Sequence, residues 1–203
     1  LAEIKKGKRM KRLIQKKLKK TKENLYYILS ALMIGLIVGG IDALFGRVLI
    51  AITDFRGRYI QIFIWFLPIA GLFICWMYHR FNEMSLKGMT LVLETAQGKR
   101  ADIPLALVPL VMVGTWITHL FGGSAGREGV AVQIGATLSH WFARRFKFAD
   151  NRTILLIAGM AAGFGGLFQT PFAAVFFAME VVVTGKMLYQ AFLPSLVAAV
   201  TAS

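Results

Sequence analysis

Long apolar runs dominate the chain and are separated by short charged segments. Four stretches contain no or almost no Asp, Glu, Lys or Arg: 24–41, 59–79, 104–126 and 153–203, the last interrupted only by Glu180 and Lys186. A helix that crosses a bilayer needs about 20 mostly apolar residues. The pattern therefore predicts an all-α polytopic membrane protein, and the first two stretches are its clearest transmembrane helices.

The later segments are less regular. A helical pattern over 130–143 covers only about 21 Å at about 1.5 Å per residue, less than a hydrocarbon core of about 30 Å. We expect this helix to begin inside the membrane. The apolar segments 153–164 and 172–184 are also short, and Gly165, Gly166 and Pro171 lie between them. Short apolar segments interrupted by glycine or proline are typical of transporters with discontinuous helices.

The composition narrows the class of protein. Of the 203 residues, 57% are hydrophobic and 17% are charged, whereas soluble domains average about 45–50% apolar and about 25% charged residues. An ordinary soluble enzyme is therefore excluded. The single cysteine, Cys75, excludes a disulfide framework.

Most of the net charge of +14 lies at the N-terminus. Residues 1–22 contain eleven Lys or Arg and one acid, Glu3, which gives +10. Apolar residues recur there at helical spacing, which predicts a basic amphipathic arm on anionic lipid, with nucleic acid as the alternative partner. We favour the lipid surface because apolar segments follow directly, and we expect no nucleic-acid partner. Residues 23–203 are expected to form the transmembrane domain.

The basic residues also predict an orientation. By the positive-inside rule the arm places the N-terminus in the cytoplasm. After two crossings the chain returns to that side, where a second group of basic residues follows: Arg80, Lys87, Lys99 and Arg100.

A glycine-rich run, 122–130, carries the most informative chemistry. It reads GGSAGREGV and enters the predicted helix. A helix N-terminus exposes unpaired N–H groups and partial positive charge, which suits an anion. A carboxylate at membrane depth is costly unless it is compensated, so Glu128 would compete with a free anion for these N–H groups, and protonation would release it. Alternatively, Arg127 and Glu128 simply pair at an interface.

Two motifs resemble the chloride channel and transporter (CLC) family. GREG followed by VQIG, over 126–135, is similar to the family's GREGP...VQIG signature. The run from Ala161 to Glu180 is similar to its AAG...FNAPL...LF..E pattern at matching spacing. The resemblance covers roughly 68–194 and implies a CLC-type fold with short, discontinuous and tilted helices, of which only the first of two inverted repeats is present. It also implies a homodimer with one pore in each subunit.

The resemblance assigns roles to individual residues. It implies that Glu128 is the gating glutamate and proton carrier. It also implies an anion site lined at the start of one helix by Gly126, Arg127, Gly129 and Val130, and at the start of another by Gly88 and Met89.

Three departures from the family pattern narrow the subclass. Val130 replaces the proline after GREG, no serine is in register near Met89, and Val181 follows Glu180 where chloride/proton exchangers carry a second glutamate. These departures are similar to the fluoride/proton antiporter branch, in which methionine replaces the chloride serine. Glu180 itself remains open between a proton site and a structural role.

The resulting expectation is transmembrane anion transport, as a fluoride (or chloride)/proton antiporter gated by Glu128. The alternatives are a passive chloride or other anion channel of the same family and a membrane scaffold or lipid-binding protein. We expect a multi-pass protein of a bacterial cell membrane, which is not an enzyme and has no cofactor or metal.

Three further features carry smaller expectations. Asp42 is expected to pair with Arg47, and Gly159 and Gly163 are expected to allow close helix packing. The chain begins at Leu1 and ends within an apolar run, so we expect a fragment that does not conduct alone, which vesicle flux would test.

Overall fold

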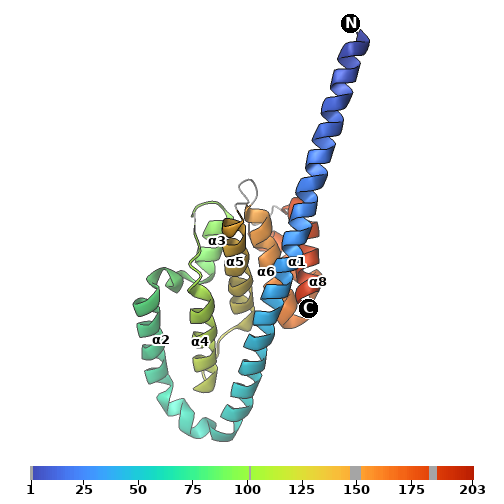
Figure 1. Ribbon diagram of the computed structural model, residues 1–203. Coiled ribbons are helices and arrows are strands. Elements are labelled where there is room, and N and C mark those ends of the chain that lie inside the picture. Colours follow the sequence, from blue (N-terminus) through green and yellow to red (C-terminus); the bar gives the residue numbers. More distant parts are fainter. Residues whose placement is uncertain (1, 101, 147–151, 183–186) are drawn as a thin grey trace.

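The computed structural model describes residues 2–100, 102–146, 152–182 and 187–203, with the backbone alone for 2–23. These residues form helices and short 3-10 turns and contain no strand, so the all-α prediction is confirmed (Figure 1). In chain order the elements are α1 Ala2–Phe63, η1 Ile64–Phe66, α2 Leu67–Phe81, η2 Glu83–Lys87, α3 Met89–Ala96, α4 Leu107–Leu120, α5 Arg127–Arg145, α6 Arg152–Phe168, α7 Pro171–Val181, η3 Tyr189–Ala191 and α8 Phe192–Ala202.

The first helix is much longer than the predicted span 24–41. α1 continues to Phe63, with a kink at Tyr59 where φ is −130° and ψ is 18°. The charged residues between the first two apolar stretches end the apolar pattern without breaking the helix. The backbone of the basic arm belongs to α1, whereas the arm's predicted amphipathic face lies outside the described side chains.

α1 and α2 form an antiparallel pair joined by a turn at the bottom of Figure 1. The last turn of α2, with His79 and Arg80, therefore lies at the end of the molecule from which α1 enters. By length and composition, one helical stretch of the described chain, Asn24–Phe81, is suited to cross a membrane. The helices that follow it are apolar but shorter than 18 residues, apart from α5.

α5 differs from the helix predicted over 130–143. It begins at Arg127 and has 19 residues, which gives about 28 Å at about 1.5 Å per residue. The helix is longer than predicted because the charged residues at both ends also belong to it, and it is still no longer than a hydrocarbon core of about 30 Å. Its start inside the membrane stays a prediction. Glu128 lies in its first turn, and Arg144 and Arg145 lie in its last.

The break between the predicted segments 153–164 and 172–184 lies later in the chain than Gly165 and Gly166. α6 runs through Gly165 and Gly166 to Phe168, so these glycines do not end it. The break falls at Gln169, which has a positive φ of 57°, and α7 then begins at Pro171. Proline suits this first helical position because its missing N–H has no intrahelical partner there.

Small residues set the contact between α5 and α6. A Cβ atom added to Gly163 would collide with the carbonyl group of Ala131, and one added to Gly159 would collide with the carbonyl of Gly135. The backbones of the two helices therefore touch, which confirms that these glycines serve close packing.

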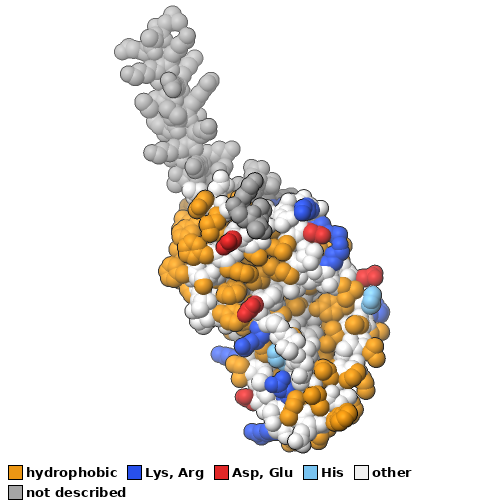
Figure 2. Space-filling view, turned by 180° about the vertical axis from the view of Figure 1, so that it is seen from behind, with side chains coloured by type: hydrophobic (Ala, Val, Ile, Leu, Met, Phe, Trp, Pro, Cys, Tyr) orange, Lys and Arg blue, Asp and Glu red, His pale blue; other side chains and the backbone are white. Residues whose placement is uncertain are grey.

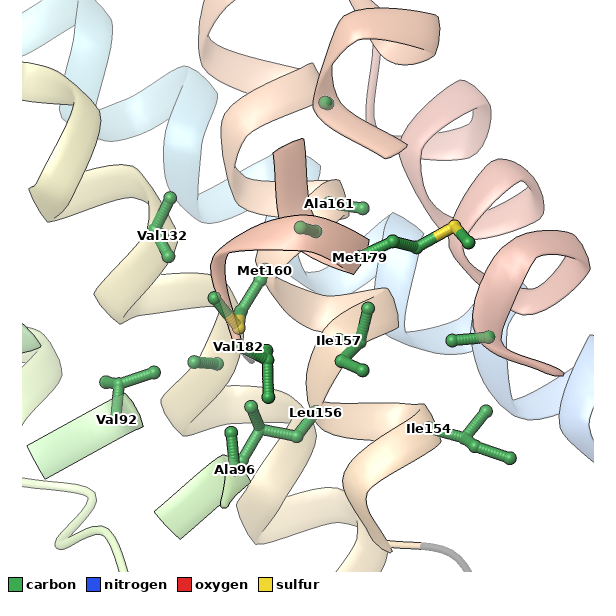
Figure 3. Close-up of a cluster of buried hydrophobic side chains, with 14 of the residues drawn as sticks. Val92, Ala96, Val132, Ile154, Leu156, Ile157, Met160, Ala161, Met179 and Val182 are labelled. Carbon is green, nitrogen blue, oxygen red and sulfur yellow. The ribbon is translucent and has the colours of Figure 1, made fainter. Parts of the chain in front are cut away.

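The core lies where α3, α5, α6 and α7 meet. Val92 of α3, Val132 of α5, Met160 of α6 and Met179 of α7 belong to one buried cluster, and Figure 3 shows Met179 extending to the side opposite Val92 and Val132. Each is fully buried or nearly so. Outside this core, hydrophobic side chains cover much of one face of the molecule (Figure 2), as expected for a surface against lipid or further protein.

Asp42 does not pair with Arg47. Asp42 is 1% exposed and neither carboxylate oxygen has a partner among the described residues, whereas Arg47 is exposed. Residues five apart lie on different faces of an α-helix, and the face of Asp42 is the one against α6, where it approaches Gly166.

Candidate anion site

The N-terminus of α5 is the first half of the candidate site. Gly126 is its N-cap residue, with φ −67° and ψ 136°, and no side chain caps the helix. The first N–H groups of an α-helix have no intrahelical acceptor. A Cβ atom added to Gly126 would meet nothing within 4 Å. The start of α5 therefore offers unpaired N–H groups in open space.

The N-terminus of α3 is the second half. Its N-cap residue is Gly88, with a positive φ of 51° and ψ of −123°, and again no side chain caps the helix. A side chain is strained at such a φ, so glycine is required where the chain turns into α3. Met89 then begins the helix and is half-buried against the core.

Gln133 of α5 connects these two helix starts. A Cβ atom added to Gly88 would lie 3.6 Å from Oε1 of Gln133, and one added to Gly129 would lie 3.8 Å from its Nε2. Val92 of α3 and Val132 of α5 belong to the same buried cluster (Figure 3), and the two helices are in contact. The structure therefore brings the segment at Gly88 and Met89 to the first turns of α5, as the resemblance implies.

The residues predicted at the start of α5 differ in exposure. Arg127 and Glu128 are exposed, and Gly129 is half-buried. No ion pair or hydrogen bond of the described residues involves the side chains of Arg127 or Glu128, so the predicted alternative of an Arg127–Glu128 pair is not formed. Val130 is 6% exposed and packs into an apolar cluster with Phe45.

Val130 also differs in its backbone. In a helix that begins at Arg127, the N–H of Val130 is the first to reach an intrahelical acceptor, the carbonyl of Gly126. The N–H groups of the four preceding residues, Gly126, Arg127, Glu128 and Gly129, have no intrahelical acceptor and stay unpaired. The geometry thus favours these four N–H groups over that of Val130.

Glu180 lies near the end of α7 and is exposed. No described contact brings it to the start of α5. The end of α7 is instead tied to α3, because Nε2 of Gln97 donates a hydrogen bond of 2.8 Å to the carbonyl of Val182. The structure therefore supports neither the proton site nor the structural role that was considered for Glu180.

Sequence reasoning missed a polar cluster at the other end of α5. Nε2 of His140 lies 3.2 Å from Oδ1 of Asp102, and Arg144 forms an ion pair with the same carboxylate. His140 is 3% exposed. The hydrogen bond from Arg144 holds the pKa of Asp102 below its usual value. This cluster fixes the segment before α4 against the end of α5, and a cavity of about 390 Å³ lies beside it.

The fold and these helix starts are typical of membrane proteins that bind an anion with backbone N–H groups. Residues 70–203 match the family described as voltage gated chloride channel. The chain therefore belongs to this family, the CLC family, whose members are membrane proteins.

Individual relatives agree with this assignment. The chain is 37% identical over 171 residues to the chloride/fluoride channel protein of Pseudomonas syringae pv. tomato, which covers 84% of this chain and 38% of the relative. It is 27% identical over 184 residues to the H(+)/Cl(-) exchange transporter ClcA of Citrobacter koseri, which covers 83% of this chain and 38% of that protein.

A solved structure is similar throughout most of the chain. The crystal structure of a CLC-type fluoride/proton antiporter superposes with a TM-score of 0.86 at 47% sequence identity. The match covers 89% of this chain and 46% of the solved chain. The chain thus spans somewhat less than half the length of these relatives and has the helical fold of that part.

Proposed function

We propose that the protein, in its full native length, transports inorganic anions across the cell membrane in exchange for protons, with Glu128 as the gate and proton carrier. The observation that carries the proposal is the uncapped N-terminus of α5, which has an exposed carboxylate in its first turn and no partner for it among the described residues. The amides of Gly126, Arg127 and Gly129 and the segment Gly88–Met89 bind the anion.

Proton coupling follows from the position of Glu128. An ionised carboxylate at a helix N-terminus is stabilised by the same N–H groups that bind an anion. When Glu128 is protonated, this attraction is lost and an anion takes its place. Each exchange of the carboxylate for an anion is therefore linked to the binding of a proton.

Fluoride is the anion that we favour. The segment before α3 supplies Met89 in place of a serine hydroxyl, and the chloride/fluoride channel protein and the fluoride/proton antiporter are among the similar proteins. A passive anion channel is the second candidate, because Val181 occupies the position at which chloride/proton exchangers of the family carry an internal glutamate.

The proposal includes an arrangement in the membrane. The basic arm 1–22 lies on the cytoplasmic side of the membrane, as the continuation of α1, so that the ends of α2 and α5 face the cytoplasm. Two copies form a homodimer in which each subunit has its own pathway. Residues 1–22 position the protein and take no part in transport.

The test uses the protein in its native length, reconstituted in liposomes. Fluoride and chloride efflux are followed with ion-selective electrodes while proton uptake is followed with a pH electrode. We expect proton uptake that accompanies anion efflux, and we expect Glu128→Gln to abolish this uptake. The matched control is Asp54→Asn, an exposed acid on α1 outside the two helix starts, which is expected to keep both fluxes.

The outcomes separate the candidates. Anion efflux from the unmodified protein without proton movement would refute the antiporter and support the passive channel. Unchanged proton uptake in Glu128→Gln would remove Glu128 from the mechanism. No flux of either anion would overturn transport itself.

A further inference from the structure

Gln133 is a largely buried residue whose carboxamide has no partner in the described part of the chain. It is 9% exposed, and its carboxamide makes no hydrogen bond or ion pair with any of the described residues. Its backbone carbonyl accepts a hydrogen bond of 2.7 Å from the hydroxyl of Thr137, so only the carboxamide is left over. Neither Nε2 nor Oε1 is among the fully buried polar atoms that lack a partner, so the carboxamide reaches the surface of the described chain, where it can bind a group from outside it.

The carboxamide lies between the two helix starts. It is within 4 Å of the Cβ positions of both Gly88 and Gly129. These distances are ordinary van der Waals contacts, so the carboxamide lies directly beside both glycines. It is therefore at the place where α3 and α5 also present unpaired N–H groups.

The chemistry of this position suits an anion. A carboxamide has two N–H donors and one carbonyl acceptor, and either can face a given neighbour because the group can turn over. With Nε2 turned toward the anion, Gln133 adds a strong neutral donor to those of the backbone. A neutral donor binds an anion without a cation that would hold it too tightly for release.

We propose that Nε2 of Gln133 donates a hydrogen bond directly to the transported anion between α3 and α5, and that it thereby helps to select fluoride. This inference rests on the proposed function and adds a side-chain ligand to it. Gln133 supplies from α5 the donor that the segment before α3 lacks, since Met89 offers no hydroxyl. Fluoride, the smallest halide and the strongest hydrogen-bond acceptor among them, gains more from such a donor than chloride does.

Binding measurements on the native-length protein in detergent test the assignment. Isothermal titration with sodium fluoride and sodium chloride gives the affinities of the unmodified protein, of Gln133→Met and of Gln61→Met. Methionine removes the donor at similar volume. We expect Gln133→Met to bind fluoride about 10- to 100-fold more weakly, the range of a hydrogen bond to a charged group, and to lose less affinity for chloride. Gln61 is exposed on α1, and its variant is expected to bind as the unmodified protein does.

A second variant separates a ligand from a merely structural residue. Gln133→Glu carries an acceptor-only carboxylate at neutral pH and a donating O–H when it is protonated. Its fluoride affinity should therefore rise as the pH falls from 7.5 to 5.5, more steeply than that of the unmodified protein. This variant carries the test if Gln133→Met does not fold.

Unchanged fluoride affinity in Gln133→Met, or a Gln133→Glu variant with the pH dependence of the unmodified protein, would overturn the role of Gln133 and leave the proposed function intact. No binding of either anion by the unmodified protein would overturn the proposed function and this inference with it. An equal loss of both anions in Gln133→Met would leave Gln133 as a ligand and refute its part in selection.

Discussion

Replacing Gly135 by alanine should separate α5 from α6 and weaken the protein. A Cβ atom at this position would lie 2.8 Å from the carbonyl carbon of Gly159 and 3.0 Å from the amide nitrogen of Gly163, and closer still to the carbonyl oxygen of Gly159. These neighbours are backbone atoms of a fully buried stretch of α6, so they cannot rotate away as a flexible side chain would.

The magnitude follows from two opposing effects. An ordinary contact begins near 3.4 Å, so the two backbones must part by more than half an ångström. Overpacking of a core by about one methyl group costs roughly 1–3 kcal/mol and occasionally more. Alanine gains about 1 kcal/mol over glycine in a helix interior. Because the clash is with rigid backbone, we expect the upper part of the overpacking range and a net loss of about 1–2 kcal/mol.

The measurement is the unfolding of the native-length protein in detergent, followed by circular dichroism as denaturant is added. The matched control is Gly40→Ala on α1, where an added Cβ meets nothing within 4 Å, and this variant is expected to be at least as stable as the unmodified protein. Equal stability of Gly135→Ala and Gly40→Ala would refute the backbone contact between α5 and α6, and with it the support that holds the start of α5 in place.

Three further predictions concern features outside the helix contact. Asp42→Asn should fold and keep or raise the stability in the same assay, because an amide is less costly than an unpartnered buried carboxylate; a large loss would show that the carboxylate has a cationic partner. Asp102→Asn should lower the stability at pH 7 by at most about 1 kcal/mol, since the pair with Arg144 is half-exposed. The pKa of Asp102 is lowered from 3.8 in the fold, so the pair stabilises the protein above that value, and the difference between variant and unmodified protein should vanish as the pH falls below it; a difference that persists at low pH would contradict this origin. Deletion of residues 1–22 should leave the anion flux per inserted protein unchanged in liposomes of neutral lipid, and a lost flux would give the arm a part in transport.

The sequence was sufficient to predict an all-α membrane fold and a glycine-rich turn that leads into α5. These features depend on local structure or on close packing: the runs without charged residues, the glycine-rich turn and the two motifs in their order. Helix ends were predicted less well. The apolar pattern stopped at Ile41 and resumed at Tyr59, yet α1 continues across this gap, because Asp and Arg side chains do not by themselves end a helix.

The pattern of apolar and charged residues could not predict contacts between distant segments. Asp102, His140 and Arg144 come together only because α4 and α5 run in opposite directions. Gln133 was part of a recognised motif, and its place one turn after Gly129 put it on the same face of the helix. The motif could not show that Gln133 is buried or that its carboxamide has no partner among the described residues, because both depend on α3 lying beside it.

One half of the candidate site therefore follows from local sequence, and the other half follows from tertiary packing. The N–H groups at the start of α5 follow from the glycine-rich run, and the second helix start is brought there by the packing of α3 against α5. Dipoles and neutral donors at this junction suit an anion that must be bound and released, and the carboxylate of Glu128 stands in the first turn of the same helix.

The most direct test of this account is the ratio of protons to fluoride ions moved by the native-length protein in liposomes, measured with and without Glu128→Gln. The account predicts a fixed ratio in the unmodified protein and fluoride movement without protons, or no movement at all, in the variant. A variant that keeps the same fixed ratio would contradict it.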